Sequence, residues 1–470
     1  MAPKLSEFVK AYDVRGLVGS QLTPAVFEAI GAAAVAVTGE KTWAVGHDMR
    51  DSGPGFAEAF ARGATRAGAD VVDAGLCSTD MLYFIAGLRN VAGAMFTASH
   101  NPAEYNGLKM CLPAARPIGL DTGLADIRDK AQAILDGESA PASATLASRK
   151  FAESEKPGTA TSEDFLAAYA QYMRDLVDLS GIRPLKVVVD AGNGMGGHTV
   201  PAVLGDQLLA ALPLDIDPMY FELDGTFPNH EANPLEPKNI VDLQARVKES
   251  GADLGLAFDG DADRCFVVDA DGEPVTPSAI TALIATRELA KHPGSAVCHN
   301  LITSKAVPEI IAEHGGRPLR TRVGHSYIKA VMAEEDAVFG GEHSGHYYFK
   351  DFWFADTGML AAMHVLAAVG GSDQTLAELA ADYVRYTASG EINSKVDDPH
   401  AKIEEVAAHF DAQEGVATDR LDGLTVSFPD GSWANLRPSN TEPLLRLNAE
   451  GPDTASMERL RDDILRIVRN

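Results

Sequence analysis

The segment Ala92–Lys109, AGAMFTASHNPAEYNGLK, runs from apolar residues into a polar turn that presents Ser99 and His100, and a lysine follows at Lys109. The apolar run is typical of a buried β-strand, so the turn lies at the end of a strand. Ligands in α/β sheets bind at the loops that follow the strands. Ser99 is therefore the first candidate functional residue.

A second candidate site is the acidic loop DGDADR, Asp259 to Arg264. Its aspartates, Asp259, Asp261 and Asp263, alternate along the chain, and such spacing brings carboxylates to one side of a loop, where they can bind a hard cation such as Mg²⁺. The loop is not an EF-hand, because Arg264 and Ala270 occupy the positions that require Gly and Glu. A solvated acidic turn is the alternative, and the apolar runs on both sides weaken it.

The loop GGEHSGH, residues 340–346, places an acid, a hydroxyl and two imidazoles between glycines. Glu342 and Ser344 alternate in an extended loop, so both can hydrogen-bond neighbouring hydroxyls of a sugar. A zinc site on His343 and His346 is the weaker interpretation, because no third ligand has suitable spacing nearby.

Close to the C-terminus, the segment RPSNTEPLLR combines Arg437 and Arg446 with Ser439, Asn440 and Thr441. Hydroxyl, amide and backbone N–H donors in a tight turn beside arginine form a nest for a phosphate dianion. A plain surface turn explains the proline and the asparagine but not the number of donors.

The segment DAGNGMGG contains a G-x-G-x-x-G pattern at Gly192, Gly194 and Gly197, with Asp215 and Asp217 about twenty residues further on. This pattern is compatible with an NAD-dependent oxidoreductase, which we keep as a remote alternative. A glycine-rich turn between strand and helix is common in any α/β unit, so a structural role or a loop beside a phosphate is favoured.

The composition narrows the class of protein. The chain has 470 residues and a net charge of −27, so its surface repels nucleic acid and anionic lipid, and we predict neither as a partner. Four separated cysteines favour buried thiols over a zinc ribbon or disulfides. No apolar run reaches the length of a membrane span, and the start MAPKLSEFVK lacks a signal-peptide core, so we predict a cytoplasmic location.

The length also predicts several domains, because single cores rarely grow beyond about 300 residues. Hydrophobic runs that end in polar turns, with helix-like stretches such as Val241–Ser250 between them, indicate repeated α/β units on mixed sheets. Linker-like composition at residues 137–161 and the break VGGSDQTLAEL after Ala368 mark two boundaries. The predicted domains are 1–155, 156–257, 258–370 and 371–470.

Five segments in order resemble the α-D-phosphohexomutase family, in particular its phosphomannomutase/phosphoglucomutase group. They are YDVRG at residues 12–16, TASHNP at 97–102, DGDADR at 259–264, GEHSGH at 341–346 and RPSNTEP at 437–443. The resemblance implies an α/β fold of four domains around one central cleft: three related mixed-sheet domains, followed by a smaller α+β domain. Each domain would supply one of the loops named above.

The resemblance also implies roles for individual residues. Ser99 would carry a phosphoryl group and would share Mg²⁺ with Asp259, Asp261 and Asp263. The other implied catalytic residues are Lys109, Arg15, His100 and His346, of which His100 supports the loop. The implied substrate-binding residues are Arg264, Lys305, His325, Lys329, Glu342, Ser344, Arg437, Ser439, Asn440 and Thr441.

The implied reaction interconverts mannose 1-phosphate and mannose 6-phosphate through phosphoserine and a hexose 1,6-bisphosphate, which is both intermediate and activator. In the loop GGEHSGH, which we call the sugar loop, His343 favours mannose and glucose phosphates over glucosamine phosphate. Phosphoglucomutase or phosphoglucosamine mutase as the main activity stays open, as does a sugar-phosphate binding module without catalysis. The partners would be small hexose phosphates, and the protein a monomer or a homodimer.

Overall fold

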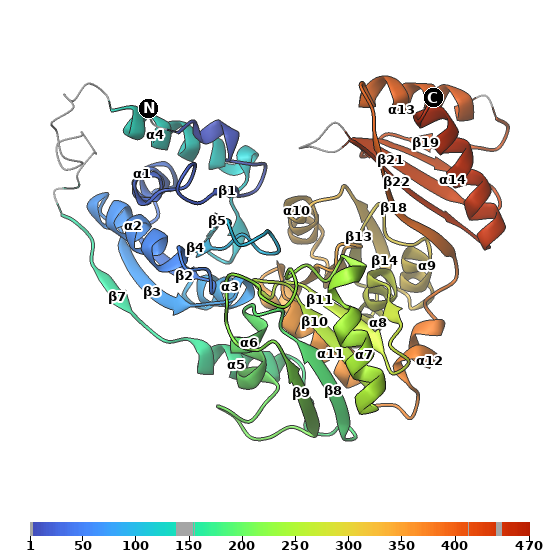
Figure 1. Cartoon of the computed structure of the whole chain (residues 1–470), viewed down its shortest axis with the longest axis horizontal. Helices are drawn as coiled ribbons and strands as arrows, with labels where there is room; N and C mark the ends of the chain where they lie inside the picture. The colour runs from blue at the N-terminus through green and yellow to red at the C-terminus, as the bar shows by residue number, and fades with distance from the viewer. Residues whose placement is uncertain (1–2, 138–153, 155, 412, 439–443) are drawn as a thin grey trace. The chain divides into compact units, whose positions relative to one another are not determined.

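The computed structural model describes residues 3–137, 154, 156–411, 413–438 and 444–470 (Figure 1). The chain divides into two compact units. The first contains residues 1–275 and 345–376, and the second contains residues 276–344 and 377–470. In the described part of the chain, no helix is both long and apolar enough to cross a bilayer.

The first unit begins with a mixed sheet in which β2 pairs in parallel with β3 and β4, while β5 runs antiparallel to β4 and β1. Its strands are β1 (Val14–Leu17), β2 (Thr42–His47), β3 (Asp70–Leu76), β4 (Ala92–Phe96), β5 (Tyr105–Leu112), β6 (Arg116–Pro117) and β7 (Ala160–Ser162). The buried rings of Phe27, Trp43, Phe60 and Phe96 pack together in the core of this sheet.

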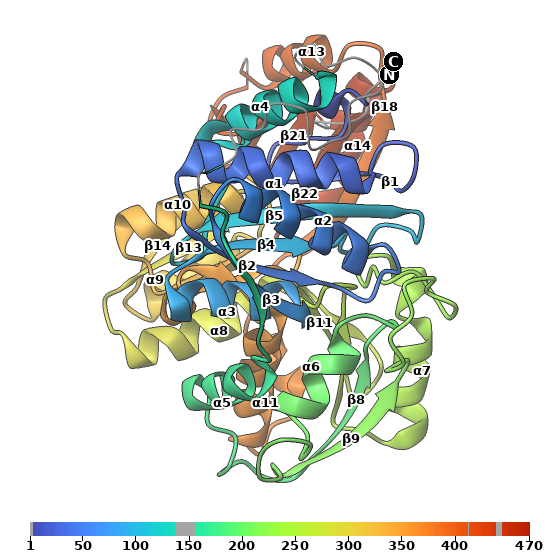
Figure 2. The ribbon, with the colours of Figure 1, turned by 90° about the vertical axis from the view of Figure 1, so that its left-hand side faces the viewer.

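Helices cover both faces of this sheet. Helices α1 (Pro24–Thr38), α2 (Gly53–Arg66) and α4 (Leu124–Asp136) lie on one face, and α3 (Thr79–Arg89) lies on the other (Figure 2). Helix α1 contains an Ala-rich segment, AIGAAAVAVT, most of which is buried. The helix begins where the Thr23 hydroxyl accepts a hydrogen bond from the backbone N–H of Val26.

The second sheet of this unit has the strand order β12-β11-β10-β8-β9. Its strands are β8 (Leu185–Asp190), β9 (Leu214–Met219), β10 (Leu254–Phe258), β11 (Cys265–Asp269) and β12 (Pro274–Val275). Helices α5 (Leu166–Leu176), α6 (Gly196–Val203) and α7 (Val241–Ser250) accompany it. The helix expected at Val241–Ser250 is therefore confirmed.

The strand pairing in this sheet contradicts the predicted domain boundary between residues 257 and 258. Strand β10 pairs antiparallel with β11, with Phe258 opposite Cys265, so the boundary falls inside a hairpin. The reason is that the acidic loop connects two strands of one sheet, whereas the sequence pattern alone allows a new unit to start at a loop. We place the boundary after β12 instead.

Further segments complete the two units. The first unit also contains β16 (Tyr347–Phe349), β17 (Ala355–Asp356) and α11 (Gly358–Gly370). In the second unit, β13 (Ala296–Asn300) pairs in parallel with β14 (Arg317–Thr321) and β15 (Phe339–Gly341). These strands alternate with α8 (Pro277–Lys291), α9 (Ala306–Glu313) and α10 (His325–Glu335). Short 3₁₀ helices lie at Leu5–Glu7, Leu120–Thr122, Pro237–Asn239 and Lys350–Phe352.

The C-terminal part follows α12 (Leu376–Ala381) and is an α+β domain. Its antiparallel sheet consists of β18 (Thr387–Lys395), β19 (Ala417–Asp419), β20 (Leu424–Ser427), β21 (Trp433–Pro438) and β22 (Leu444–Gly451). Helices α13 (Pro399–Asp411) and α14 (Thr454–Val468) pack against this sheet and against each other (Figure 1). Buried Val406, Phe410, Leu436 and Leu447 belong to the core between the helices and the sheet.

Candidate active site

The serine loop, which contains Ser99 and connects β4 to β5, follows the buried strand β4 in the first unit. Ser99 is 4% exposed and has a left-handed backbone with φ of 49°. Its N–H donates to the Thr97 hydroxyl at 2.8 Å, and its own hydroxyl donates to Asp259 Oδ2 at 2.8 Å. The loop therefore presents the Ser99 hydroxyl directly to the acidic loop.

The acidic loop approaches the serine loop closely at Gly260. A Cβ at this position would lie 2.4 Å from the carbonyl oxygen of Ser99, so only glycine allows the two backbones to come this near. The N–H of Met195 donates to the carbonyl oxygen of Gly260 at 2.9 Å. The glycine-rich turn after β8 thus binds the backbone of the acidic loop and stabilises its position.

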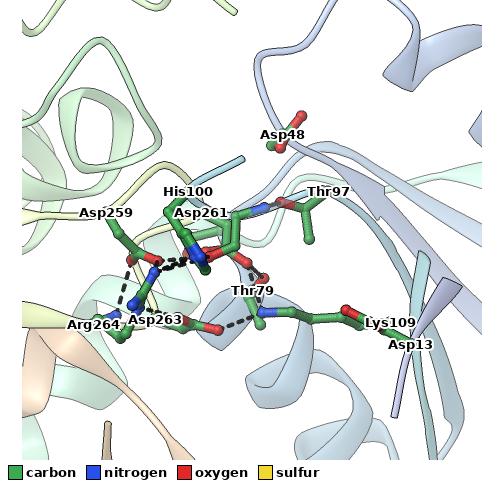
Figure 3. A network of polar contacts seen from close by, with 12 residues as sticks. Asp13, Asp48, Thr79, Thr97, His100, Lys109, Asp259, Asp261, Asp263 and Arg264 are labelled. Atoms are coloured by element: carbon green, nitrogen blue, oxygen red, sulfur yellow. Dashed lines mark hydrogen bonds and ion pairs between the residues drawn. The ribbon is translucent and has the colours of Figure 1, made fainter. Parts of the chain in front are cut away.

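Three buried carboxylates form the centre of the site (Figure 3). Asp259, Asp261 and Asp263 offer ligand oxygens within 4.8 Å of one another. Lys109 Nζ donates to Asp261 at 2.8 Å and to Asp263 at 2.5 Å, while Arg264 Nε donates to Asp259 at 2.9 Å. Three negative charges are therefore balanced in part by two cations.

The buried charges shift one another's pKa values. Burial opposes ionisation of Asp261, but the charge of Lys109 and the hydrogen bonds from Lys109 and Thr79 hold the pKa of Asp261 below its usual range. Burial raises the pKa of Asp259 to about 7, against the opposing charge of Arg264. Burial disfavours the charged form of Lys109, yet Asp261 and Asp263 raise the Lys109 pKa well above its ordinary value.

The aspartates fit a divalent cation. Asp261 Oδ1 and Asp263 Oδ1 are buried and have no hydrogen-bond partner, which is costly for carboxylate oxygens unless a cation binds them. Oxygen donors of this kind are the ligands that Mg²⁺ prefers. The cluster is therefore a candidate acidic metal site.

The remaining predicted residues of this unit surround the serine. Arg15, on β1, donates to Asn101 Oδ1 of the serine loop at 2.7 Å. Arg264 Nη2 lies 2.5 Å from His100 Nδ1, and burial, together with the charge of Arg264, lowers the pKa of His100 well below its usual value. His346 Nε2 lies 3.8 Å from Asp263. The structure thus places Arg264 and His100 beside the Ser99 hydroxyl, Arg15 at the serine loop and His346 at the acidic loop.

The second unit contains the other predicted binding residues. Glu342 is buried, and its Oε1 accepts from Asn300 Nδ2 and from the N–H of Gly324, which precedes His325 at the start of α10. Ser344 lies two residues beyond Glu342 in the same loop. The sugar loop and the start of α10 are therefore adjacent.

The second unit also contains the predicted lysine and arginine residues. The N–H of Lys305 donates to Glu450 at 2.9 Å, and its Nζ lies 5.7 Å from the centroid of the Tyr386 ring. Lys329 is a buried residue of α10. Arg437 donates to Glu391 at 3.1 Å. Three members of the phosphate nest lie outside the described residues: Ser439, Asn440 and Thr441.

The glycines of the dinucleotide-like pattern serve backbone packing. A Cβ at Gly194 would lie 2.6 Å from the carbonyl oxygen of Gly260, and one at Gly197 would lie 2.1 Å from that of Phe221. Both glycines are therefore needed where backbones touch. This packing accounts for the pattern without a dinucleotide and removes the basis of the oxidoreductase alternative.

Sequence reasoning missed two side chains that shape the site. Thr79, the first residue of α3, donates its hydroxyl to Asp261 at 2.6 Å. Arg50, in the segment that follows β2, donates to backbone carbonyl oxygens of the serine loop. The polar segment HDMRDS, residues 47–52, follows an apolar strand as the other site loops do, so the same rule could have found Arg50. No comparable signal marks Thr79.

The arrangement is suited to phosphoryl transfer, in which a protein mainly positions the reactants and supplies positive charge around the phosphoryl oxygens. A hydroxyl beside a candidate metal site, an ammonium group and guanidinium groups provides both. This is the class of chemistry that the fold and the site define.

Comparisons with known proteins agree with this class. Four models of the phosphoglucomutase/phosphomannomutase family match residues 6–136, 165–272, 276–386 and 391–467, as α/β/α domains I, II and III and the C-terminal domain. The phosphohexose mutase of Xanthomonas campestris is 40% identical over 98% of both chains, and the phosphomannomutase of Salmonella montevideo is 38% identical over the same shares. A solved Burkholderia thailandensis protein of this family, 30% identical, aligns with a TM-score of 0.84 over 98% of this chain and 97% of its own.

The chain therefore belongs to the phosphoglucomutase/phosphomannomutase family of α-D-phosphohexomutases and is an enzyme of that class. The predicted family and the predicted architecture, three α/β domains and a C-terminal α+β domain, are both confirmed.

Proposed function

We propose that this enzyme interconverts mannose 1-phosphate and mannose 6-phosphate and also accepts glucose phosphates. The observation that carries the proposal is the hydrogen bond of 2.8 Å between the Ser99 hydroxyl and Asp259 in a buried acidic cluster that also contains Lys109 and Arg264. Relatives named phosphomannomutase that are 38% identical over nearly the whole chain support mannose as the main sugar.

Ser99 stores the phosphoryl group. In the forward half-reaction the bond from phosphorus to Ser99 Oγ breaks, and a bond forms from phosphorus to the free hydroxyl oxygen of the hexose phosphate. The sugar hydroxyl gives its proton to a base, and Ser99 Oγ ends the step protonated. The product is a hexose 1,6-bisphosphate. This intermediate reverses its orientation within the site and returns its other phosphoryl group to Ser99.

The basic residues of the first unit have separate parts in this step. Arg15, Lys109 and Arg264 place positive charge around the phosphoryl oxygens. Lys109 and His346 are the candidates for proton transfer, with Arg15 assisting. His100 stays neutral, because its pKa is lowered by burial and by Arg264, so it supports the loop.

Asp259, Asp261 and Asp263, with Ser99, are the residues that would hold Mg²⁺, and the ion when bound would withdraw electrons from the phosphoryl group. The two buried oxygens without a hydrogen-bond partner, Asp261 Oδ1 and Asp263 Oδ1, support this assignment.

The second unit supplies the groups that bind the sugar phosphate. We assign the ring hydroxyls to Glu342 and Ser344. We assign the distal phosphate to Arg437, Ser439, Asn440 and Thr441. The basic residues Lys305, His325 and Lys329 are assigned to the surroundings of the substrate.

The partners are therefore small hexose phosphates, and neither nucleic acid nor membrane is expected. The cytoplasmic location, and the state as monomer or homodimer, stay predictions.

Kinetics with three substrates test the proposal. We expect kcat/KM to be highest for mannose 1-phosphate, lower for glucose 1-phosphate and lowest for glucosamine 1-phosphate, with Mg²⁺ and a trace of hexose 1,6-bisphosphate present. A preference for glucosamine 1-phosphate would make phosphoglucosamine mutase the main activity. Binding of all three sugars without turnover would indicate a binding module instead.

A further inference from the structure

Arg50 is a buried cation whose partners all surround the serine loop. Its side chain is 2% exposed. Nη2 donates to the carbonyl oxygens of Ser99 at 3.0 Å and Asn101 at 2.6 Å, while Nη1 donates to those of Pro102 and Tyr105, both at 2.8 Å. The four N–H groups on the two terminal nitrogens thus match four carbonyl oxygens of one short loop.

Residues outside the serine loop also fix the Arg50 side chain. Asp48 Oδ1 accepts the backbone N–H of Arg50 at 3.0 Å, and Asp48 Oδ2 lies 3.3 Å from Arg50 Nε. The Phe227 ring covers the guanidinium, with its centroid 5.0 Å from the Arg50 Cζ. At Gly225, a Cβ would come within 2.8 Å of the Arg50 Cα. The group is therefore fixed by charge, by a ring and by close backbone packing.

The serine backbone needs such a constraint. A left-handed backbone is unfavourable for a residue other than glycine, and Ser99 adopts it with φ of 49°. Because Arg50 binds the carbonyl oxygen of Ser99 itself, it stabilises this conformation at the residue that presents the hydroxyl to Asp259.

Another side chain could not replace this contact. The planar guanidinium has five N–H donors in a fixed arrangement, whereas an ammonium has three donors on a tetrahedral nitrogen. Lysine would keep the charge beside Asp48 but would leave at least one of the four carbonyl oxygens without a donor.

We infer that Arg50 is a positioning residue for phosphoryl transfer: it sets the backbone of the serine loop so that the Ser99 hydroxyl faces the acidic cluster. This role rests on the proposed function, in which Ser99 carries the phosphoryl group. Arg50 acts through the loop and does not touch the substrate.

The chain offers a matched control for this role. Arg174, on α5, also donates to three backbone carbonyl oxygens, those of Val203, Gly205 and Ala210. It binds a structural turn after α6 and not the serine loop. Comparison of Arg50→Ala with Arg174→Ala therefore separates a loss of carbonyl contacts from a loss of serine positioning.

The test measures kcat, KM, unfolding and the phosphoserine content of each variant. We expect Arg50→Ala to lower kcat by about 100-fold, the loss typical of a displacement near 1 Å, with KM changed less than about threefold. Arg174→Ala should lose stability but keep its kcat. Arg50→Lys, which keeps the buried charge and so favours folding, should also lose kcat.

Chemical rescue adds a readout that a structural role alone would not move. Millimolar guanidinium should restore part of the kcat of Arg50→Ala, and potassium chloride at equal ionic strength should not. Rescue should be absent in Arg174→Ala and in Ser99→Ala.

The inference is overturned if Arg50→Lys or Arg50→Ala keeps wild-type kcat, if Arg174→Ala loses kcat equally, or if guanidinium gives no rescue in a folded Arg50→Ala protein. A wild-type protein without mutase activity and without phosphoserine would instead refute the proposed function. The two failures are therefore distinguishable.

Discussion

Replacement of Lys109 by methionine removes the amine that binds Asp261 and Asp263, while it keeps most of the apolar side chain. The Lys109 side chain is 14% exposed and its two partners are at most 1% exposed, so water cannot compensate for the loss. Breaking a buried ion pair by removal of one partner typically costs about 3–5 kcal/mol, because the remaining charge stays buried. We expect the unfolding free energy of Lys109→Met to fall by this amount without divalent ions.

Denaturant unfolding in EDTA and in excess Mg²⁺ measures the effect. Because a divalent cation neutralises the same carboxylates, Mg²⁺ should restore much of the lost stability in the variant. Lys238→Met is the control, since Lys238 and Glu231 form a pair that is 66% and 50% exposed and should be worth less than about 1 kcal/mol. An equally small loss for Lys109→Met, or a large loss that Mg²⁺ does not reduce, would refute the reasoning.

Three further variants test other parts of the account. Gly260→Ala should abolish turnover, because the added Cβ would lie 2.4 Å from the carbonyl oxygen of Ser99; wild-type kcat would contradict this. Asp261→Asn should raise the Mg²⁺ concentration for half-maximal rate, measured by titration, and an unchanged value would count against the metal site. Burial raises the pKa of Asp80 to about 6, so the native state binds this proton more tightly than the unfolded chain. Relative to Asp80→Asn, the unfolding free energy of the wild type should therefore fall by about 2 kcal/mol as pH rises from about 4 to 7, and the same pH dependence in both proteins would refute this.

The loops of the site were predictable because each has a local pattern. The apolar strand before Ser99, and the alternating aspartates from Asp259 to Asp263, are visible within a dozen residues. The four cysteines are buried and free, as their spacing predicts.

Contacts between distant segments were not predictable without the family resemblance. The ion pairs of Lys109 join residues 152 and 154 positions apart, and only the fold of the sheets brings them together. The contact of Thr79 with Asp261 spans 182 positions. Composition and spacing contain no information on such pairs, because tertiary packing decides them.

The misplaced boundary after residue 257 has a similar cause. A strand that ends in a polar loop is compatible with the end of a domain or with a hairpin, and only pairing in space separates the two. The pairing of Leu254 with Asp269 and of Phe258 with Cys265 shows a hairpin. Likewise, the glycines of the dinucleotide-like pattern meet neighbouring backbones that the sequence does not reveal.

Intact mass spectrometry of the purified enzyme tests the central claim most directly. The wild type, after incubation with hexose 1,6-bisphosphate, should carry the added mass of one phosphoryl group, and peptide mapping should place it on Ser99. Ser52→Ala is the control, since this hydroxyl accepts a hydrogen bond from Asn106, and the variant should keep the added mass. Ser99→Ala should lose both the added mass and nearly all turnover. A wild type that never gains the phosphoryl group, or a Ser99→Ala enzyme that turns over normally, would contradict the account.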